Sequence, residues 1–417
     1  MKKIQKTKTI QSSFEHGIKK NFLQISLLII SAIFVGATIG IERTLLVPLG
    51  LEFGLQSLTI ITSFIVAFGI AKAFTNLIAG KLADLIGRFR VLIIGWLFGI
   101  PVPFMLLFAS DWTIVIIANI LLGINQGICW TLTLFMKIDL CGPNKRGFGA
   151  GVNETFGYLA VAFAGFISIE LANLYGLKPY PFIFGIIAVL AGTIITALFV
   201  RDTTQHLMKE NKDLDGGDTR PWLTVFKQMS YQNSRLVSCV QAGLVRNLVD
   251  GMAWGLLMIF FTSNLGNRTA GTFQWIMIAS FGGSQVFFGS LSDKTQRKIF
   301  ISSGMVIISF SLLIISWTAS YISWLLSVVL LGIGGALMYP VVIAALCDQI
   351  PPIWRATGLG IYRFWRDLGY AIGALLSGII ADSLGIIPTI LIVAIISATS
   401  GIVVMIFLPS KLIIQKN

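Results

Sequence analysis

GKLADLIGRFR, residues 80–90, is a short basic stretch that lies between two long apolar runs of the chain. Gly80 and Gly87 allow the backbone to turn tightly where two helices meet. The acid Asp84 can form ion pairs with the nearby arginines, either across the turn or at neighbouring helix ends. A segment this short cannot form a domain, and a segment this charged is costly to place in lipid. We therefore interpret it as a loop that joins two membrane-spanning helices.

A degraded copy of this stretch, GSLSDKTQRK, occupies residues 289–298. The copy begins 209 positions after the first and lacks a match to Gly87. Other residues repeat at the same offset: Leu122-Gly123-Ile124 with Leu331-Gly332-Ile333, Asp139 with Asp348, and Arg146 with Arg355. Because these independent matches share one offset, which is half the chain length, the sequence indicates two homologous halves.

The pattern G-x-x-x-D-x-x-G-R-x-R resembles the loop between the second and third helices of the major facilitator superfamily. At the level of the fold, the resemblance covers essentially the whole chain. It implies an all-α membrane protein with twelve transmembrane helices in two six-helix bundles, at residues 1–200 and 236–417. Residues 201–235 would then form the cytoplasmic linker between the bundles.

The composition also indicates a membrane protein. Of the 417 residues, 55% are hydrophobic and only 12% are charged, whereas soluble proteins carry about 25% charged residues. The four cysteines lack the spacing of a disulfide framework or a zinc site, and both histidines lie in polar segments. We therefore expect a multi-pass membrane protein without a metal or a cofactor.

Twelve segments are long and apolar enough to span a bilayer, which takes about 20 residues. They are 22–48, 57–80, 91–110, 112–136, 148–173, 180–200, 236–262, 270–291, 299–318, 321–346, 356–380 and 384–408. Within the linker, Pro221–Met229 is expected to form a short helix at the membrane interface.

The distribution of lysine and arginine predicts the orientation of the spans. Of these residues, 24 fall on the side of the termini and the linker, and only Lys178 and Arg268 fall in loops on the other side. The positive-inside rule then makes both termini cytoplasmic, in the inner (cytoplasmic) membrane of a bacterium. The net charge of +13 reflects this topology rather than binding of nucleic acid.

The remaining five cations fall inside predicted spans, where a charge is costly and usually faces a partner or a water-filled path. In the seventh span, Arg246 and Asp250 are four residues apart and can pair on one helix face, beside Asn247. Two alternatives stay open for this group. It is either a cavity-facing site for solute or proton, or a self-neutralised pair that fixes helix packing.

The eleventh span carries Tyr362, Arg363, Arg366 and Asp367. Arg363 and Asp367 are again four residues apart and can pair. Arg366 lies on the neighbouring face without an obvious acid on its own helix, so it suits an anionic group of a solute. The alternative is an ion pair between Arg366 and Asp250 or another helix.

Polar residues of the first half add further candidates. Glu42 and Arg43 lie near the outer end of the first span, where we expect an extracellular gate. Lys72 shares one face of the second span with Asn76, in the inner half of the membrane.

Two features of the fourth and fifth spans leave alternatives open. Asn125 and Gln126 can either hydrogen-bond a solute or simply cross-link helices. Glu154 is related to Arg363 by the offset of 209 positions. Opposite charges at equivalent positions suggest a latch between the halves at the inner face, and a proton-titrating carboxylate is the alternative for Glu154.

We assign the candidate residues to two groups. The predicted solute or proton pathway comprises Arg246, Asn247, Asp250, Asn125, Gln126, Tyr362, Arg363, Arg366 and Asp367. The predicted gating or coupling residues are Glu42, Arg43, Lys72, Glu154, Gly80, Asp84, Gly87, Arg88, Arg90 and Asp293. No residue is assigned a catalytic or metal-binding role, because the spans contain no histidine and no hydrolase motif.

These features predict a monomeric secondary transporter that moves a small organic anion or zwitterion by alternating access. Carboxylates inside the spans favour proton symport, so the expected partners are the solute, protons and the lipid bilayer, with no nucleic acid. A multidrug or metabolite exporter of the same superfamily is the alternative. The superfamily's proton antiporters often carry a glycine–proline motif in the fifth helix, but 149–165 contains no proline. An intramembrane enzyme or a sensor fits the sequence less well.

Overall fold

The computed structural model describes residues 16–141, 146–206, 221–292, 295–350 and 355–410. Within these ranges the regular structure is helical, and no residue belongs to a strand. The helices of the first half are α1 (Phe22–Glu52), α2 (Leu58–Ile86), α3 (Arg88–Gly99), α4 (Pro101–Leu107), α5 (Trp112–Cys141), α6 (Arg146–Tyr175) and α7 (Tyr180–Phe199). Because Pro101 has no N–H to donate, it separates α3 from α4, and the two helices together form one span.

The second half begins with the short helix α9 (Trp222–Lys227) and the π-helical turn η2 (Gln228–Gln232), where the sequence predicts an interfacial helix. One long span then consists of α10 (Ser234–Met252), a π-helical turn η3 (Ala253–Leu257) and α11 (Met258–Leu265). The remaining helices are α12 (Asn267–Ser292), α13 (Arg297–Trp317), α14 (Tyr321–Gln349), α15 (Arg355–Leu384) and α16 (Ile386–Phe407).

All twelve predicted spans correspond to helices. Eleven of the described helical segments are long and apolar enough to cross a membrane by length and composition. The twelfth, α12, has 26 residues but carries polar side chains, including the buried Gln274 and Gln285. The ends differ from the prediction in two places that matter. Helix α2 continues to Ile86 and α3 begins at Arg88, so residues 80–90 are helical on either side of Gly87 instead of forming a loop, and the chain does not turn at Gly80. Helix α5 continues to Cys141, so Lys137 lies inside a span and not in a loop.

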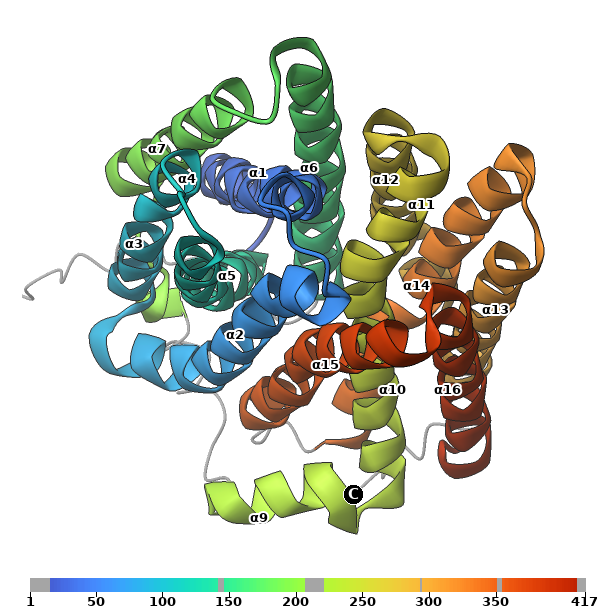
Figure 1. Ribbon diagram of the computed structural model, residues 1–417. Coiled ribbons are helices and arrows are strands. Elements are labelled where there is room, and N and C mark those ends of the chain that lie inside the picture. The colour runs from blue at the N-terminus through green and yellow to red at the C-terminus, as the bar shows by residue number, and fades with distance from the viewer. Residues whose placement is uncertain (1–15, 142–145, 207–220, 293–294, 351–354, 411–417) are drawn as a thin grey trace, which may run out of the picture.

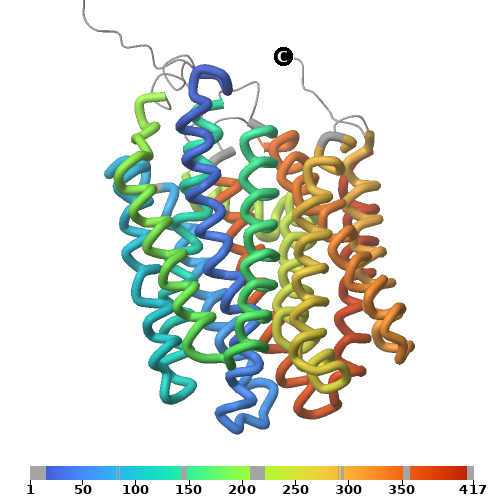
Figure 2. Tube along the Cα trace, turned by 90° about the horizontal axis from the view of Figure 1, so that it is seen from above, coloured from blue at the N-terminus to red at the C-terminus, as the bar shows by residue number. Residues whose placement is uncertain are grey.

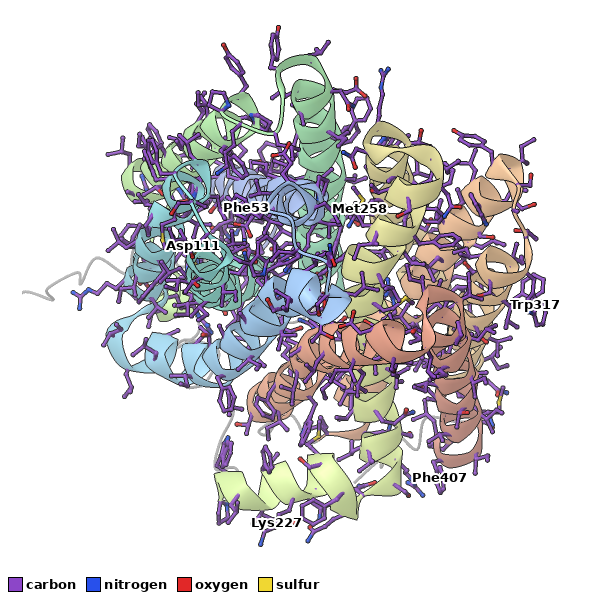
Figure 3. All side chains as sticks on the ribbon, viewed as in Figure 1. Phe53, Asp111, Lys227, Met258, Trp317 and Phe407 are labelled. Atoms are coloured by element: carbon purple, nitrogen blue, oxygen red, sulfur yellow. The ribbon has the colours of Figure 1, made fainter. Side chains whose placement is uncertain are left out.

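Figure 1 shows α1–α7 grouped beside α10–α16, an arrangement that supports the proposed division into two bundles. The two groups meet mainly where α2 packs against α15 and where α6 packs against α12. Side chains on the periphery are apolar: Trp317 on α13 and Phe407 on α16 point outward in Figure 3, as expected for surfaces that face lipid.

The two ends of the molecule can be told apart by the helices that begin or end there. We call the end where α1 begins and α16 ends the terminal face, which lies at the top of Figure 2. The other end, where α2 begins and α15 ends, is the opposite face. The sequence predicts that the terminal face is cytoplasmic.

The internal repeat is also visible in three dimensions. Arg88, at the start of α3, pairs with Asp139 near the end of α5, with 2.6 Å between Nε and the carboxylate. Arg297, at the start of α13, pairs in the same way with Asp348 near the end of α14. Each member of the second pair lies 209 positions after its counterpart, so the duplicated sequence places the same ion pair in both halves.

The stretch that identifies the repeat turns at Gly87 between α2 and α3, and the φ of Gly87, 94°, lies in the left-handed region that favours glycine. The backbone N–H of Phe89 donates to Asp202, which follows α7. Partial burial raises the pKa of Asp202, but hydrogen bonds from Thr204 and Phe89 outweigh it and lower the pKa overall. Arg90 is exposed on the first turn of α3. Asp293 and the side chain of Asp84 lie outside the described part of the chain.

Candidate functional site

Asp367, on α15, is the centre of a buried polar cluster. Its carboxylate accepts hydrogen bonds from Arg366 Nε at 2.6 Å, Asn247 Nδ2 at 3.1 Å and Asn76 Nδ2. The side chain is fully enclosed. These donors come from three helices, and α2 belongs to the first half whereas α10 and α15 belong to the second. Asp367 therefore joins the two helix groups in the interior of the molecule.

The hydrogen-bonded chain continues from Asn76 through the first half. Thr131 on α5 donates to Asn76 Oδ1 at 2.6 Å and accepts from Arg363 Nη1 at 2.7 Å. Arg363 also lies 3.8 Å from a carboxylate oxygen of Glu154 on α6. Glu154 accepts in turn from the indole N–H of Trp130 at 3.0 Å.

On its other side the cluster reaches α14. Arg366 donates to the hydroxyl of Tyr339 at 2.6 Å, and that hydroxyl lies 3.4 Å from the hydroxyl of Tyr158 on α6. Together with the residues just described, these side chains form what we call the central network. Its members are Glu154, Arg363, Thr131, Asn76, Asp367, Asn247, Arg366, Tyr339 and Tyr158.

Two pairing predictions for α15 are wrong. Arg363 does not pair with Asp367, although they are four residues apart, because its guanidinium extends to α5 and α6 of the other half. Arg366 is not an unpaired cation, because it forms an ion pair with Asp367, its neighbour in sequence. Tyr362 packs its ring 5.9 Å from the Arg366 guanidinium and leaves its hydroxyl without a partner among the described residues.

Arg246 and Asp250 form the ion pair that their spacing predicts on α10. A Cβ on Gly335 of α14 would lie 2.6 Å from Arg246 Nε, so this glycine provides the space for the guanidinium. The pair borders an internal cavity of about 10 Å³, near the minimum that holds one water. The cavity is lined by Tyr158, Arg246, Asp250, Trp254, Met277, Ile278 and Phe281.

Arg43 and Lys72 lie against aromatic rings rather than against acids. The Arg43 guanidinium is 4.2 Å from the ring centre of Phe68 and 4.8 Å from that of Trp254 on η3. The Lys72 ammonium lies 5.3 Å from the same Phe68 ring and 5.4 Å from Tyr370. Arg43 and Glu42 are buried, and Arg43 touches the second half through Trp254.

The amides of α5 bind other helices. Asn125 donates to the backbone carbonyl of Gly95 on α3 at 2.9 Å, and Gln126 donates to that of Val35 on α1 at 2.9 Å. Of the two alternatives that the sequence leaves open, these hydrogen bonds are of the kind expected for the cross-linking of helices.

Several residues that are prominent in the structure are not among the candidates that the sequence indicates. Lys137 is fully buried and donates to the carbonyl of Leu28 at 3.0 Å. Lys137 directly follows the predicted span 112–136 in sequence, and this position was the one sign that it could lie inside a helix. The sequence did not indicate that Thr131, Tyr158 or the other hydroxyl-bearing residues belong to the central network. Residues of these types are also common in helices that face lipid or other helices.

Polar side chains join the two halves at the opposite face. Asp382, near the end of α15, accepts hydrogen bonds from the Leu58 and Thr59 N–H groups and from the Ser57 and Thr59 hydroxyls at the start of α2. Arg268, near the start of α12, pairs bidentately with Glu170 near the end of α6. We call these two contacts the opposite-face latches.

Two relatives cover most of the chain. An uncharacterized MFS-type transporter of Methanocaldococcus jannaschii is 24% identical over 339 residues, which are 81% of this chain and 86% of the relative. A multidrug resistance protein of Proteus mirabilis is 25% identical over 332 residues, which are 77% of this chain and 79% of the relative.

Solved structures show the same fold. A POT family transporter in complex with a thioalcohol-conjugated peptide superposes with a TM-score of 0.76 at 13% identity, over 92% of this chain and 95% of the other. A POT family transporter in complex with 5-aminolevulinic acid gives the same values.

The family model described as Major Facilitator Superfamily matches residues 27–278 and 242–413, which together span nearly all of the chain. The repeated ion pair, the eleven described segments that are long and apolar enough to cross a membrane, and the buried network between two helix groups agree with this match. The chain therefore belongs to the Major Facilitator Superfamily of membrane transporters.

Proposed function

We propose that the protein is a secondary active transporter that carries a small organic anion or zwitterion by alternating access, coupled to protons. The observation that carries this proposal is the central network, which joins the two halves through buried charges. Buried charges inside a membrane are costly, and they are usually found on solute, ion or proton pathways. A network across the interface can be broken and reformed as the halves rock.

Proton coupling is proposed for Asp250 and its partner Arg246. Burial disfavours the ionised carboxylate, whereas the guanidinium favours it. A solute that disturbs the contact between Arg246 and Asp250 would leave Asp250 without its partner and favour uptake of a proton. Solute and proton would then move together, which is symport.

The test uses the purified protein in liposomes with a panel of labelled metabolites. The expected result is saturable uptake that a proton gradient drives above equilibrium. In Asp250→Asn, we expect counterflow exchange to persist while gradient-driven accumulation is lost, because exchange requires only the rocking motion. Full accumulation by Asp250→Asn would exclude the coupling role. Ohmic, non-saturable flux would contradict the transporter mechanism itself.

A multidrug or metabolite exporter is the second candidate, because one relative with 25% identity is a multidrug resistance protein. Export of lipophilic cations by everted vesicles would support it. Efflux of such cations without any accumulation of organic anions would favour the exporter over the first candidate.

The orientation belongs to the same proposal. We infer that the terminal face is cytoplasmic, that the membrane is the bacterial inner membrane, and that the transporter acts as a monomer. The excess of lysine and arginine on the side of the termini supports the first of these points. Protease accessibility of the linker in right-side-out and everted vesicles tests it.

A further inference from the structure

Arg43 is enclosed in protein without a hydrogen-bond partner. Its side chain is fully buried, and among the described residues none of its Nε, Nη1 and Nη2 atoms has a partner. The guanidinium instead lies against the rings of Phe68, Trp254 and Phe64. Contact with ring faces attracts the charge but leaves the N–H donors in the plane of the group unused. A buried donor set of this kind is costly unless a ligand uses it.

Lys72 is a second cation on the same ring system. Its ammonium shares the Phe68 ring with Arg43 and also lies 5.7 Å from the ring centre of Trp130. No hydrogen bond or ion pair of Lys72 is found within the described ranges. Both cations therefore lie beside the Phe68 ring, where a bound carboxylate would be attracted to each of them.

The nearby acids Asp367 and Glu42 attract the two cations electrostatically but form no ion pair with them among the described residues. Asp367 attracts Lys72 electrostatically, but its oxygens already accept from Arg366, Asn76 and Asn247. Glu42 precedes Arg43 on α1, and successive residues on a helix point about 100° apart. No ion pair joins Glu42 to Arg43 in the described structure.

Trp254 separates Arg43 from the cavity beside Arg246 and Asp250. Its ring lies 4.8 Å from the Arg43 guanidinium, stacks on Tyr370 at 4.7 Å, and also lines the cavity. Its indole N–H has no partner among the described residues. The residue sits on the π-helical turn η3, and such turns inside helices are often found at functional sites.

We propose that Arg43 and Lys72 bind the carboxylate of the solute, whose planar apolar part lies against the rings of Phe68 and Trp254. The aromatic walls favour a flat apolar group, and the two unpaired cations favour a carboxylate. This inference rests on the transport function proposed above and specifies its solute class as aromatic or similarly flat carboxylic acids. It also assigns Arg43 to solute binding instead of to an extracellular gate.

The test measures ligand binding in detergent by thermal unfolding, with benzoate and phenylacetate as probes and their uncharged amides as controls. A ligand that binds the folded state raises the unfolding temperature by mass action. We expect the acids to raise it and the amides to leave it unchanged. Arg43→Met and Lys72→Met should each weaken the apparent affinity for the acids about tenfold or more.

Lys137→Met is the matched control, because Lys137 is an equally buried cation that already has a backbone partner. This variant should unfold at a lower temperature without acid but keep the shift that the acids cause. Arg43→Met should not lower the unfolding temperature, because it removes donors that are unsatisfied. A large drop in Arg43→Met would instead show that Arg43 is a packing residue.

Other results overturn the proposal. They are an equal shift by acids and amides, acid shifts unchanged in Arg43→Met and Lys72→Met, or no shift in the wild type. Because binding is measured apart from transport, saturable gradient-driven uptake in liposomes would leave the transport function standing if this site failed.

Discussion

Asp367 holds three donors from three helices inside the protein, and it is fully enclosed. A buried ion pair contributes little net stability, but removal of one partner leaves the other charge uncompensated. The Arg366 guanidinium is the group that would be left in this way. Asp367 is therefore a residue on which both stability and movement depend.

We predict that Asp367→Asn destabilises the protein by about 3 kcal/mol and abolishes transport, because Arg366 loses its counter-charge. Thermal unfolding in detergent and uptake in liposomes measure the two effects. Asn247→Ala is the control, because it removes a neutral donor to the same carboxylate and should cost only about 1 kcal/mol. A stable, active Asp367→Asn protein would contradict the assignment.

Residue spacing predicted some of these contacts and not others. The four-residue spacing of Arg246 and Asp250 correctly indicated an ion pair, because both side chains stay on α10. The same spacing failed for Arg363, because a long side chain at a helix–helix contact can reach another helix. Spacing within one helix carries no information about which acids a neighbouring helix presents.

At the scale of elements, the close contact of α2 and α15 is completed by Asp382. A carboxylate that accepts from the first N–H groups of a helix acts as an N-cap, and here the cap comes from the other half of the molecule. The sequence predicted α2 and α15 as spans, with ends within a few residues. It could not predict this cap, because Asp382 and Ser57 are far apart in sequence and the pairing depends on how the halves meet.

We predict that Asp382→Asn loosens the opposite face. The expected cost is about 1 kcal/mol of helix-cap stability, and the separation of α2 from α15 should expose Thr62, which is fully buried between them. The measurement is labelling of Thr62→Cys by an impermeant maleimide, in a background without the four native cysteines. Faster labelling in the Asp382→Asn background is the expected outcome.

Asp111→Asn provides the matched control for this experiment. Asp111 caps α5 at the same face through the N–H groups of Thr113 and Ile114, but it lies in the same half as the helix it caps. It is labelled in Figure 3. Its loss should cost similar cap stability without faster labelling. Equal labelling in the two variants would show that the cap acts only on local helix stability.

At the scale of the whole molecule, the repeat gives each half its own ion pair at the terminal face. Arg88 with Asp139 and Arg297 with Asp348 each lie within one half, so they stiffen the halves without joining them. The sequence predicted the repeat, the fold class and the twelve spans, because hydropathy and duplication are properties of the chain itself. The central network depends on the relative position of the halves, which the sequence does not give. Of its contacts, the sequence indicated only that between Glu154 and Arg363, because these two residues are related by the repeat.

We predict that Arg88→Asp and Asp139→Arg each lower the yield of monodisperse protein and that the double exchange restores most of it. Restoration should be incomplete, because Asp139 also accepts from Thr203 at 2.8 Å. Size-exclusion chromatography and thermal unfolding give the comparison. The corresponding exchange of Arg297 and Asp348 should have an additive effect, since distant sites are usually independent. No rescue by either double exchange would show that the ion pairs are not the stabilising contacts.

We also predict that the contact of Glu154 with Arg363 responds to the opposite face. Under alternating access, loosening one side favours closure of the other. Glu154→Cys and Arg363→Cys should therefore cross-link to a greater extent when combined with Asp382→Asn. Identical cross-linking with and without Asp382→Asn would argue against a latch and favour a local role for both residues.

The two opposite-face latches differ in chemistry, and dissolved salt should distinguish them. Arg268 is largely exposed, and its attraction to Glu170 is screened over about 8 Å at physiological ionic strength. The α2 cap relies on short hydrogen bonds from uncharged donors, on which screening has less effect. Concentrated salt should therefore weaken the contact between α6 and α12 before that between α2 and α15. The opposite face would then open first along α6 and α12 at high salt, and along both contacts together in dilute buffer.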